Sequence, residues 1–123
     1  MIRLDGKTAI VTGATRSIGE YIARGLHAAG AAVMVTGIDD APGAAVAATL
    51  GGRAAYRHTD VESDEQIEAC LADTKKHFGR LDILVNCACS YLDSGIATPR
   101  ADWLVALNVN VVGPAIFTQK AVP

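Results

Sequence analysis

The chain has 123 residues, half of them hydrophobic, so it has the size of one domain and enough apolar surface for a sizeable core. Its 11 basic and 13 acidic side chains are spread without runs, which argues against nucleic acid or an anionic membrane as the main partner. We therefore expect a small-molecule partner.

Cysteine usage and hydropathy predict a cytoplasmic protein. Two of the three cysteines, Cys87 and Cys89, are too close for an ordinary disulfide, so we expect free thiols in a reducing compartment. No continuous apolar stretch approaches the ~18 residues needed to span a bilayer. Residues 1–7 also lack the charged and apolar blocks of a secretory signal. Neither a membrane nor nucleic acid is expected as a partner.

Apolar, strand-prone runs alternate with helical patterns in the first half of the chain. A strand is predicted over residues 7–12, and a helix follows it to about residue 29. A second strand covers residues 32–36, an alanine-rich helix covers 42–50, and a short third strand covers 54–58. Glycines follow both helices, where they can adopt the left-handed capping conformation.

The same alternation continues in the second half. A helix is predicted from about residue 63 to 77, and a strand covers residues 81–86. This strand is the most hydrophobic, which favours a place near the centre of the sheet. After a loop, a helical pattern runs from residue 100 toward 121, interrupted by Gly113 and Pro114.

Strands alternating with helices four times predict right-handed βαβ crossovers and a parallel sheet. The predicted fold class is therefore α/β, with a doubly wound parallel sheet in three αβα layers that stops after about four strands. Ligands of such sheets bind beyond the carboxyl ends of the strands. No repeat or linker divides the chain, so residues 1–123 are expected to form one unit.

The stretch from Thr12 to Gly19 joins the first strand to the first helix and reads Thr-Gly-Ala-Thr-Arg-Ser-Ile-Gly. Gly13 and Gly19 permit a tight turn and close backbone approach. The free N–H groups and positive dipole end of the new helix favour an anion. Because many strand-to-helix turns carry two glycines only in order to turn, the stretch by itself predicts either a phosphate cradle or a plain turn.

From Leu4 to its last residue the chain resembles the short-chain dehydrogenase/reductase family. Family members carry Thr-Gly, three residues and Gly-x-Gly, and here Ser17 replaces the middle glycine. Serine is small and able to cap the helix start, but it alters how closely the backbone approaches the pyrophosphate. The resemblance implies a Rossmann-type domain and cofactor contacts from the turn through Gly13, Thr15, Arg16, Ser17, Ile18 and Gly19.

Positions after the second and third strands correspond to the nucleoside end of the family's cofactor site. The resemblance implies that Asp60 and Val61 hold the adenine ring, although a helix-capping aspartate is an equal alternative for Asp60 alone. Gly37 stands where relatives that choose NAD have an acidic residue, and Asp39 lies two positions further on. Arg16 occupies a place where a basic side chain meets a 2′-phosphate, so the cofactor is NAD or NADP, with a slight lean to NADP.

Residues 86–89 read Asn-Cys-Ala-Cys where the family has Asn-Asn-Ala-Gly. Asn86 and Ala88 match and are implied to contact the cofactor. Cys87 and Cys89 depart, and the side chain of Cys89 could crowd the nicotinamide ribose or move the loop. The histidines show no ligand spacing with these cysteines, so no metal site is expected.

The catalytic residues of the family are only partly present. Asn110 and Gly113 match its Asn-x-x-Gly helix segment, which implies that Asn110 disturbs the helix locally and holds a water in the proton relay. Asn108 is the competing candidate, and only the spacing to Gly113 decides against it. The chain has no Tyr-x-x-x-Lys, because the residues four positions after the three tyrosines are two glycines and an aspartate.

The resemblance therefore implies the cofactor-binding half of an NAD(P)-dependent oxidoreductase that transfers hydride between nicotinamide and an alcohol or carbonyl substrate. The catalytic C-terminal part is absent from the sequence, so the chain alone is expected to be inactive. An unpaired strand edge would invite association, and the expected partners are a second copy in a homo-oligomer or a complementary C-terminal fragment. The alternative is a non-catalytic nucleotide-binding or interaction module derived from the same fold.

Overall fold

Four parallel strands form the sheet in the computed structural model, which describes residues 2–92 and 94–123. They are β1 (Thr8–Val11), β2 (Ala32–Gly37), β3 (Ala54–His58) and β4 (Ile83–Val85). Their order across the sheet is β3-β2-β1-β4, and each pairing is parallel. The chain therefore runs outward from β1 to β3 and then crosses back to the other side of β1.

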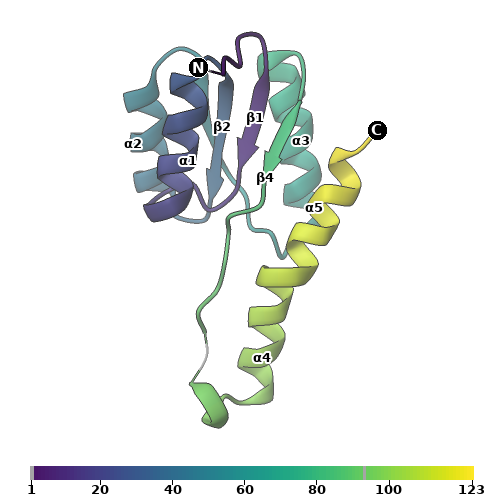
Figure 1. Cartoon of the computed structure of the whole chain (residues 1–123). Helices are drawn as coiled ribbons and strands as arrows, with labels where there is room; N and C mark the ends of the chain where they lie inside the picture. The colour runs from purple at the N-terminus through teal and green to yellow at the C-terminus, as the bar shows by residue number, and fades with distance from the viewer. Residues whose placement is uncertain (1, 93) are drawn as a thin grey trace.

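Helices cover both faces of this sheet (Figure 1). One face carries α1 (Ser17–Ala28) and α2 (Asp40–Leu50), and the other carries α3 (Asp64–Phe78) and α5 (Gly113–Ala121). A short 3-10 helix, η1 (Gly95–Ala97), precedes α4 (Arg100–Leu107), which extends beyond the sheet. The three-layer α/β architecture expected from the sequence is confirmed.

Alternating strand residues divide the core into two layers. Val11 points toward α1 and α2, whereas its neighbour Ile10 belongs to the cluster formed with α3 and α5. Met34 and Phe117 join Ile10 in the second cluster, and these three side chains are almost completely buried. Because both faces of each central strand are covered, the strands need continuous apolar runs, as their sequences show.

Local signals define the helix ends closely. The Ser63 hydroxyl accepts a hydrogen bond from the Gln66 N–H at 3.2 Å, which caps the start of α3. Gly79 ends that helix in the left-handed conformation with φ of 83°, and Gly51 follows α2 with φ of 88°. The predicted bounds of these helices therefore differ from the observed ones by only one or two residues.

The fourth strand lies at the edge of the four described strands and not near the centre, where its hydropathy predicts it. Within the described residues β4 pairs only with β1, at the edge of the sheet, and its three residues are half-buried. It is also shorter than predicted, because Asp82 precedes the paired segment and uses its carboxylate to accept the Thr8 N–H at 2.9 Å. The apolar character of β4 thus exceeds what its one observed neighbour requires.

A π-helical turn (Asn108–Val112) joins α4 to α5, so residues Arg100–Ala121 form one continuous helix of 22 residues. Its most apolar 18-residue window has a mean hydropathy of 1.3, and 11% of that window is buried. By length and composition alone this helix could cross a membrane, which corrects the expectation that no such segment exists. The expectation failed because it counted uninterrupted apolar runs, whereas this helix contains scattered polar residues.

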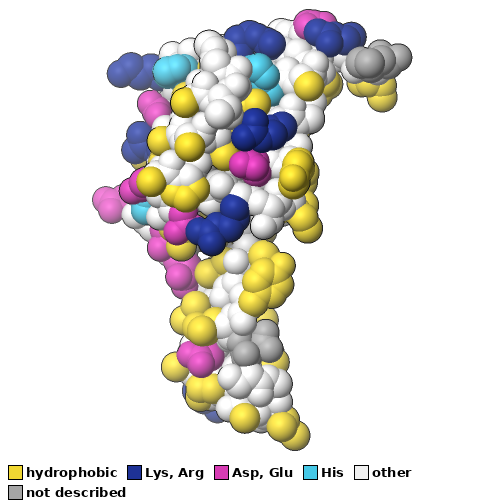
Figure 2. Space-filling model, turned by 90° about the vertical axis from the view of Figure 1, so that its left-hand side faces the viewer, with side chains coloured by type: hydrophobic (Ala, Val, Ile, Leu, Met, Phe, Trp, Pro, Cys, Tyr) yellow, Lys and Arg dark blue, Asp and Glu magenta, His cyan; other side chains and the backbone are white. Residues whose placement is uncertain are grey.

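Large hydrophobic side chains lie exposed along the narrow projection that α4 forms below the sheet (Figure 2). Trp103 and Leu107 are each 50% exposed, and Val111 is 57% exposed. The sequence placed these three residues on one helical face. The three side chains do share one face of the helix, but among the described residues nothing covers this face, and it is exposed to solvent.

Candidate functional site

A groove with a volume of about 460 Å³ lies at the carboxyl ends of the strands. Its walls come from the turn after β1, the ends of β2 and β3, and the loop that follows β4. The predicted cofactor-binding residues that line it are Gly13, Thr15, Arg16, Ser17, Ile18, Gly19, Gly37, Asp60, Val61 and Ala88. Segments far apart in sequence therefore meet where the topology predicts a ligand.

The turn after β1 packs so closely that glycine is required at two positions. Gly13 has φ of 61°, and a Cβ atom there would lie 2.7 Å from Ala88 Cα. A Cβ atom on Gly19 would overlap the carbonyl oxygen of Gly13. The backbone of the turn therefore fits between the start of α1 and the loop after β4, with the first N–H groups of the helix beside the groove.

Ser17 is the single described non-glycine residue with a left-handed backbone, at φ of 52°. It stands where the family pattern has glycine, so the local conformation is the one that glycine favours. The expected capping role is not observed: among the described residues, neither the Ser17 hydroxyl nor the N-cap residue Arg16 makes a side-chain capping bond. Ser17 thus adopts a backbone conformation that is unfavourable for a residue with a side chain, and no capping hydrogen bond offsets this strain.

The ends of β2 and β3 form the second wall. Asp60 lines the groove, and its Oδ1 accepts the Glu62 N–H at 2.9 Å. The N-cap of α3 is Ser63, so Asp60 stabilises the turn before the helix rather than the helix start. A Cβ atom on Gly37 would lie 2.6 Å from Thr15 Cγ2, so glycine is needed there for the wall to close on the turn.

An ion pair crosses this end of the groove. The Arg16 guanidinium donates to the carboxylate of Asp39, and their side chains are 65% and 42% exposed. Arg16 was predicted as a cofactor residue, but its pairing with Asp39 was not. The pair joins the glycine turn to the segment after β2, and each charge is partly neutralised by the other.

Thr12 attaches the loop after β4 to the glycine turn. Its Oγ1 accepts the backbone N–H groups of both Cys87 and Ala88 at 3.0 Å. Cys87, Ala88 and Cys89 line the groove. Asn86 lies outside it, because its Nδ2 donates to Thr118 Oγ1 on α5 at 3.1 Å. The loop therefore presents the two cysteines, rather than the predicted asparagine, to the groove.

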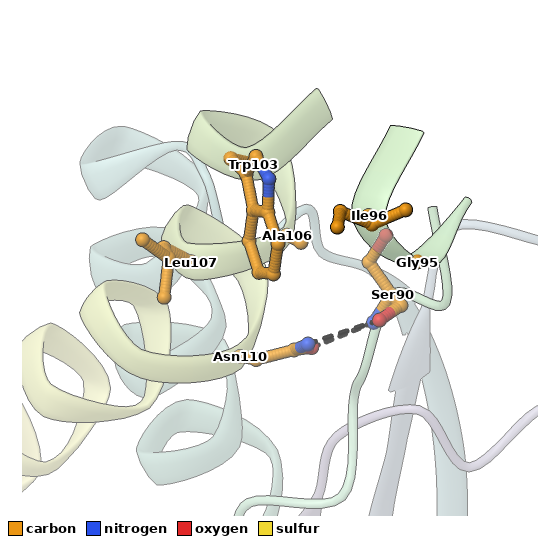
Figure 3. Close-up of a pocket in the computed structure, with 7 residues that line it drawn as sticks. All are labelled: Ser90, Gly95, Ile96, Trp103, Ala106, Leu107 and Asn110. Atoms are coloured by element: carbon orange, nitrogen blue, oxygen red, sulfur yellow. Dashed lines mark hydrogen bonds between the residues drawn. The ribbon is translucent and has the colours of Figure 1, made fainter. Parts of the chain in front are cut away.

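Asn110 lies in the π-helical turn, so the expected local disturbance of the helix is present. Its Oδ1 accepts the Ser90 N–H at 2.7 Å, and its Nδ2 donates to the Ser90 carbonyl at 2.9 Å (Figure 3). Asn108 instead donates to Glu62 Oε1 at 2.8 Å. The spacing to Gly113 thus separates two asparagines with different partners, and Asn110 is the one bound to the loop after β4.

Asn110 borders a second hollow, with a volume of about 390 Å³, between that loop and α4. The indole of Trp103 and the side chain of Ile96 border it from opposite sides (Figure 3). The hollow is therefore mostly apolar, with the Asn110 amide at its polar end.

Sequence reasoning did not assign several groove residues to the cofactor, namely Ile38, Asp39, Thr59, Glu62, Cys87, Cys89, Tyr91 and Val109. Most are sequence neighbours of predicted ones, so the ends of the same strands would have indicated them. Val109 comes from the distant helix, where it directly precedes the predicted residue Asn110. Within residues 2–92 and 94–123, no group of three or more His, Cys, Asp or Glu side chains could hold a metal ion.

The parallel sheet, the glycine turn and the groove at the strand ends define an α/β protein of the Rossmann type. The family model described as short chain dehydrogenase matches residues 7–123, so the chain belongs to the short-chain dehydrogenase family.

Individual relatives agree with this assignment. Tropinone reductase-like 2 of Erythroxylum coca is 42% identical over 124 residues, which cover 97% of this chain and 45% of that protein. The crystal structure of a hydroxysteroid dehydrogenase from Escherichia coli matches with a TM-score of 0.90 and 34% identity, covering 97% of this chain and 52% of that one. A dehydrogenase/reductase from Sinorhizobium meliloti 1021 matches with a TM-score of 0.91 and 37% identity, covering 97% and 49%. The chain spans about half the length of these relatives.

Proposed function

We propose that the chain binds NAD or NADP in the groove and acts as the cofactor-binding half of an oxidoreductase that works on an alcohol or carbonyl substrate. The observation that carries this proposal is the convergence of ten predicted cofactor residues from separate segments on a single groove. The bound nicotinamide would supply or accept the hydride. The residues of this chain would bind and orient it.

The residues present fit a dinucleotide. The turn leaves a cradle that a Cβ atom at Gly13 or Gly19 would fill, and the N-terminus of α1 opens onto it. A pyrophosphate there would meet free N–H groups and the positive end of the helix. Asp60 and Val61 form the wall at the far end, where the base of the nucleoside would lie.

The nucleotide site is tested by placing a charge in the cradle. Ile18 is 69% exposed in the first turn of α1 and lines the groove, so Ile18→Glu adds a negative charge where the anion would bind. We expect NAD(P)H affinity, measured by fluorescence titration, to fall by about tenfold or more. Tyr21→Glu is the matched control, because Tyr21 is 74% exposed on the same helix but lies outside the groove lining. Equal losses in both variants would refute the site.

The expected preference for NADP over NAD rests on Arg16. Because Arg16 is paired with Asp39, the preference can be tested by substituting either residue. Arg16→Ala should weaken NADP binding more than NAD binding, because only NADP carries the 2′-phosphate that a guanidinium can hold. Asp39→Asn should strengthen NADP binding more than NAD binding, because it frees Arg16 and removes a repelling charge. Equal effects on both nucleotides in the two variants would contradict this preference.

Turnover requires groups that the described residues do not supply. We propose that a further segment carrying a Tyr-x-x-x-Lys pair covers the free edge of β4 and donates the proton, with Asn110 holding a water in the relay. Its test is addition of a complementary C-terminal fragment of a family member to the chain, followed by NAD(P)H oxidation with a ketone substrate. Nucleotide binding without activity in every such mixture would favour the alternative, a non-catalytic nucleotide-binding module.

A further inference from the structure

We propose that Cys87 and Cys89 form a thiol–disulfide exchange site in the wall of the groove, at which reaction with a small disulfide excludes the nucleotide. Both cysteines line the groove, with Ala88 between them. The exclusion rests on the proposed nucleotide-binding function, whereas the thiol chemistry rests on the groove alone.

Hydrogen bonds hold the backbone on both sides of Cys89. Before it, the N–H groups of Cys87 and Ala88 donate to Thr12 Oγ1 at 3.0 Å. After it, Ser90 exchanges two hydrogen bonds with the Asn110 side chain, at 2.7 and 2.9 Å. The Cys89 thiol is therefore held at the groove wall.

An adduct at this wall would lie beside the cradle. Ala88 contacts the glycine turn so closely that a Cβ on Gly13 would come within 2.7 Å of Ala88 Cα. A glutathionyl group, which is a tripeptide, attached to the adjacent Cys89 would occupy much of a groove of about 460 Å³. The same space cannot also hold a dinucleotide, so modification and binding should exclude each other.

The two thiols differ in reactivity. Cys89 is exposed, whereas Cys87 is half-buried. Burial, and then the nearby Cys89, raises the pKa of the Cys87 thiol, which lowers its thiolate fraction. Cys89 is therefore the thiol that attacks first, and Cys87 is the neighbour that can react second.

The exchange is balanced in two steps. The Cys89 thiolate attacks one sulfur of a small disulfide such as oxidised glutathione, so a mixed disulfide forms and one glutathione leaves as a thiolate that takes a proton from water. Cys87, as thiolate, then attacks the Cys89 sulfur and releases the second glutathione. Because only Ala88 separates the two cysteines, the resulting Cys87–Cys89 bond is strained and easily reduced, unlike an ordinary structural disulfide. Two protein thiols are oxidised and one small disulfide is reduced to two thiols.

The experiment treats the reduced chain with oxidised glutathione and maps the products by tryptic mass spectrometry. Cys87 and Cys89 share the peptide between Arg80 and Arg100, whereas Cys70 lies on another peptide and is a buried internal control. We expect a glutathionyl adduct, or the loss of two hydrogens, on the first peptide and an unmodified Cys70. Cys89→Ser should abolish both products, and Cys87→Ser should leave only the mixed disulfide.

A second arm measures the coupling to nucleotide. With NAD(P)H at about ten times its Kd, modification of Cys89 should slow roughly tenfold, because only the free groove reacts. The modified chain should bind NAD(P)H about tenfold more weakly or worse, whereas the affinity of Cys89→Ser should not change with the treatment.

The outcomes separate the two proposals. Equal modification of Cys70 and Cys89, or equal nucleotide affinity before and after modification, overturns the exchange site while nucleotide binding stands. If the reduced chain binds no nucleotide, the proposed function fails and the exclusion fails with it. If Cys89 is still modified selectively when the chain binds no nucleotide, the thiol chemistry stands and only the proposed nucleotide site fails.

Discussion

Replacing Ser17 by glycine should stabilise the chain, although glycine usually destabilises a protein. Ser17 has φ of 52°, in the left-handed region that side chains disfavour. The cost of this conformation to a non-glycine residue is about 1–2 kcal/mol. Glycine removes that cost but loses more backbone freedom on folding, roughly 0.5–1 kcal/mol. The free energy of unfolding should therefore rise, by up to about 1.5 kcal/mol.

The measurement is urea denaturation followed by circular dichroism, with two controls. Ala45→Gly introduces the same residue at an exposed interior position of α2, and it should lower the free energy of unfolding by about 1 kcal/mol. Ser17→Ala keeps a side chain on the left-handed backbone, so it should bring no gain. The two glycine variants should thus shift stability in opposite directions.

Either of two results would refute the reasoning. If Ser17→Gly and Ala45→Gly lower stability by the same amount, then the left-handed backbone at residue 17 carries no cost. If Ser17→Ala stabilises the chain as much as glycine does, the hydroxyl rather than the backbone is the source of the effect.

Two further predictions concern contacts between distant segments. Hydrogen bonds from Arg80 and from the Thr8 N–H lower the pKa of Asp82, so this carboxylate stabilises the fold above its unfolded pKa of about 3.9 and loses that contribution as the pH falls further. Asp82→Asn should therefore unfold at lower urea than the parent at neutral pH, and the difference should shrink below about pH 4; a constant difference would contradict this. Gly113→Ala should cost about 1–3 kcal/mol, because its Cβ would lie 2.7 Å from the Val61 carbonyl oxygen. Thermal unfolding of Gly113→Ala should thus occur well below that of another helical glycine-to-alanine change, at position 25, where the Cβ meets nothing within 4 Å.

Local sequence patterns predicted most of the fold because each element is defined by its own residues. The cap at Ser63 and the glycine at position 79 bound α3, and the alternation of strands and helices defined the parallel sheet. Hydropathy alone suggested a central position for β4, since it reports how apolar a strand is and not which strands pair with it. Its edge position depends on pairing, which no local pattern contains.

The sequence indicates which residues line the groove where a short motif contributes several of them, and it does not indicate the contacts that form where elements meet. The glycine turn placed six cofactor candidates in one segment, and all six line the groove. Asn86 lies outside the groove lining because its side chain bonds Thr118, which lies on a distant helix and which no local pattern connects to it. The Arg16–Asp39 pair was missed for the same reason, because the two residues approach each other only when β1 and β2 are side by side.

The apolar composition of the helix over residues Arg100–Ala121 is compatible both with a membrane span and with packing on the sheet. Its apolar residues satisfy a length and composition test for a membrane span, yet its C-terminal part packs on α3 through the fully buried Phe117. The π-helical turn between the two parts directs the Asn110 amide onto Ser90, a polar contact that ties the helix to the loop after β4. That contact holds the helix beside the groove, whose lining includes Val109 from the same π-helical turn. The one helix therefore contributes both to the apolar core, through Phe117, and to the groove wall, through Val109.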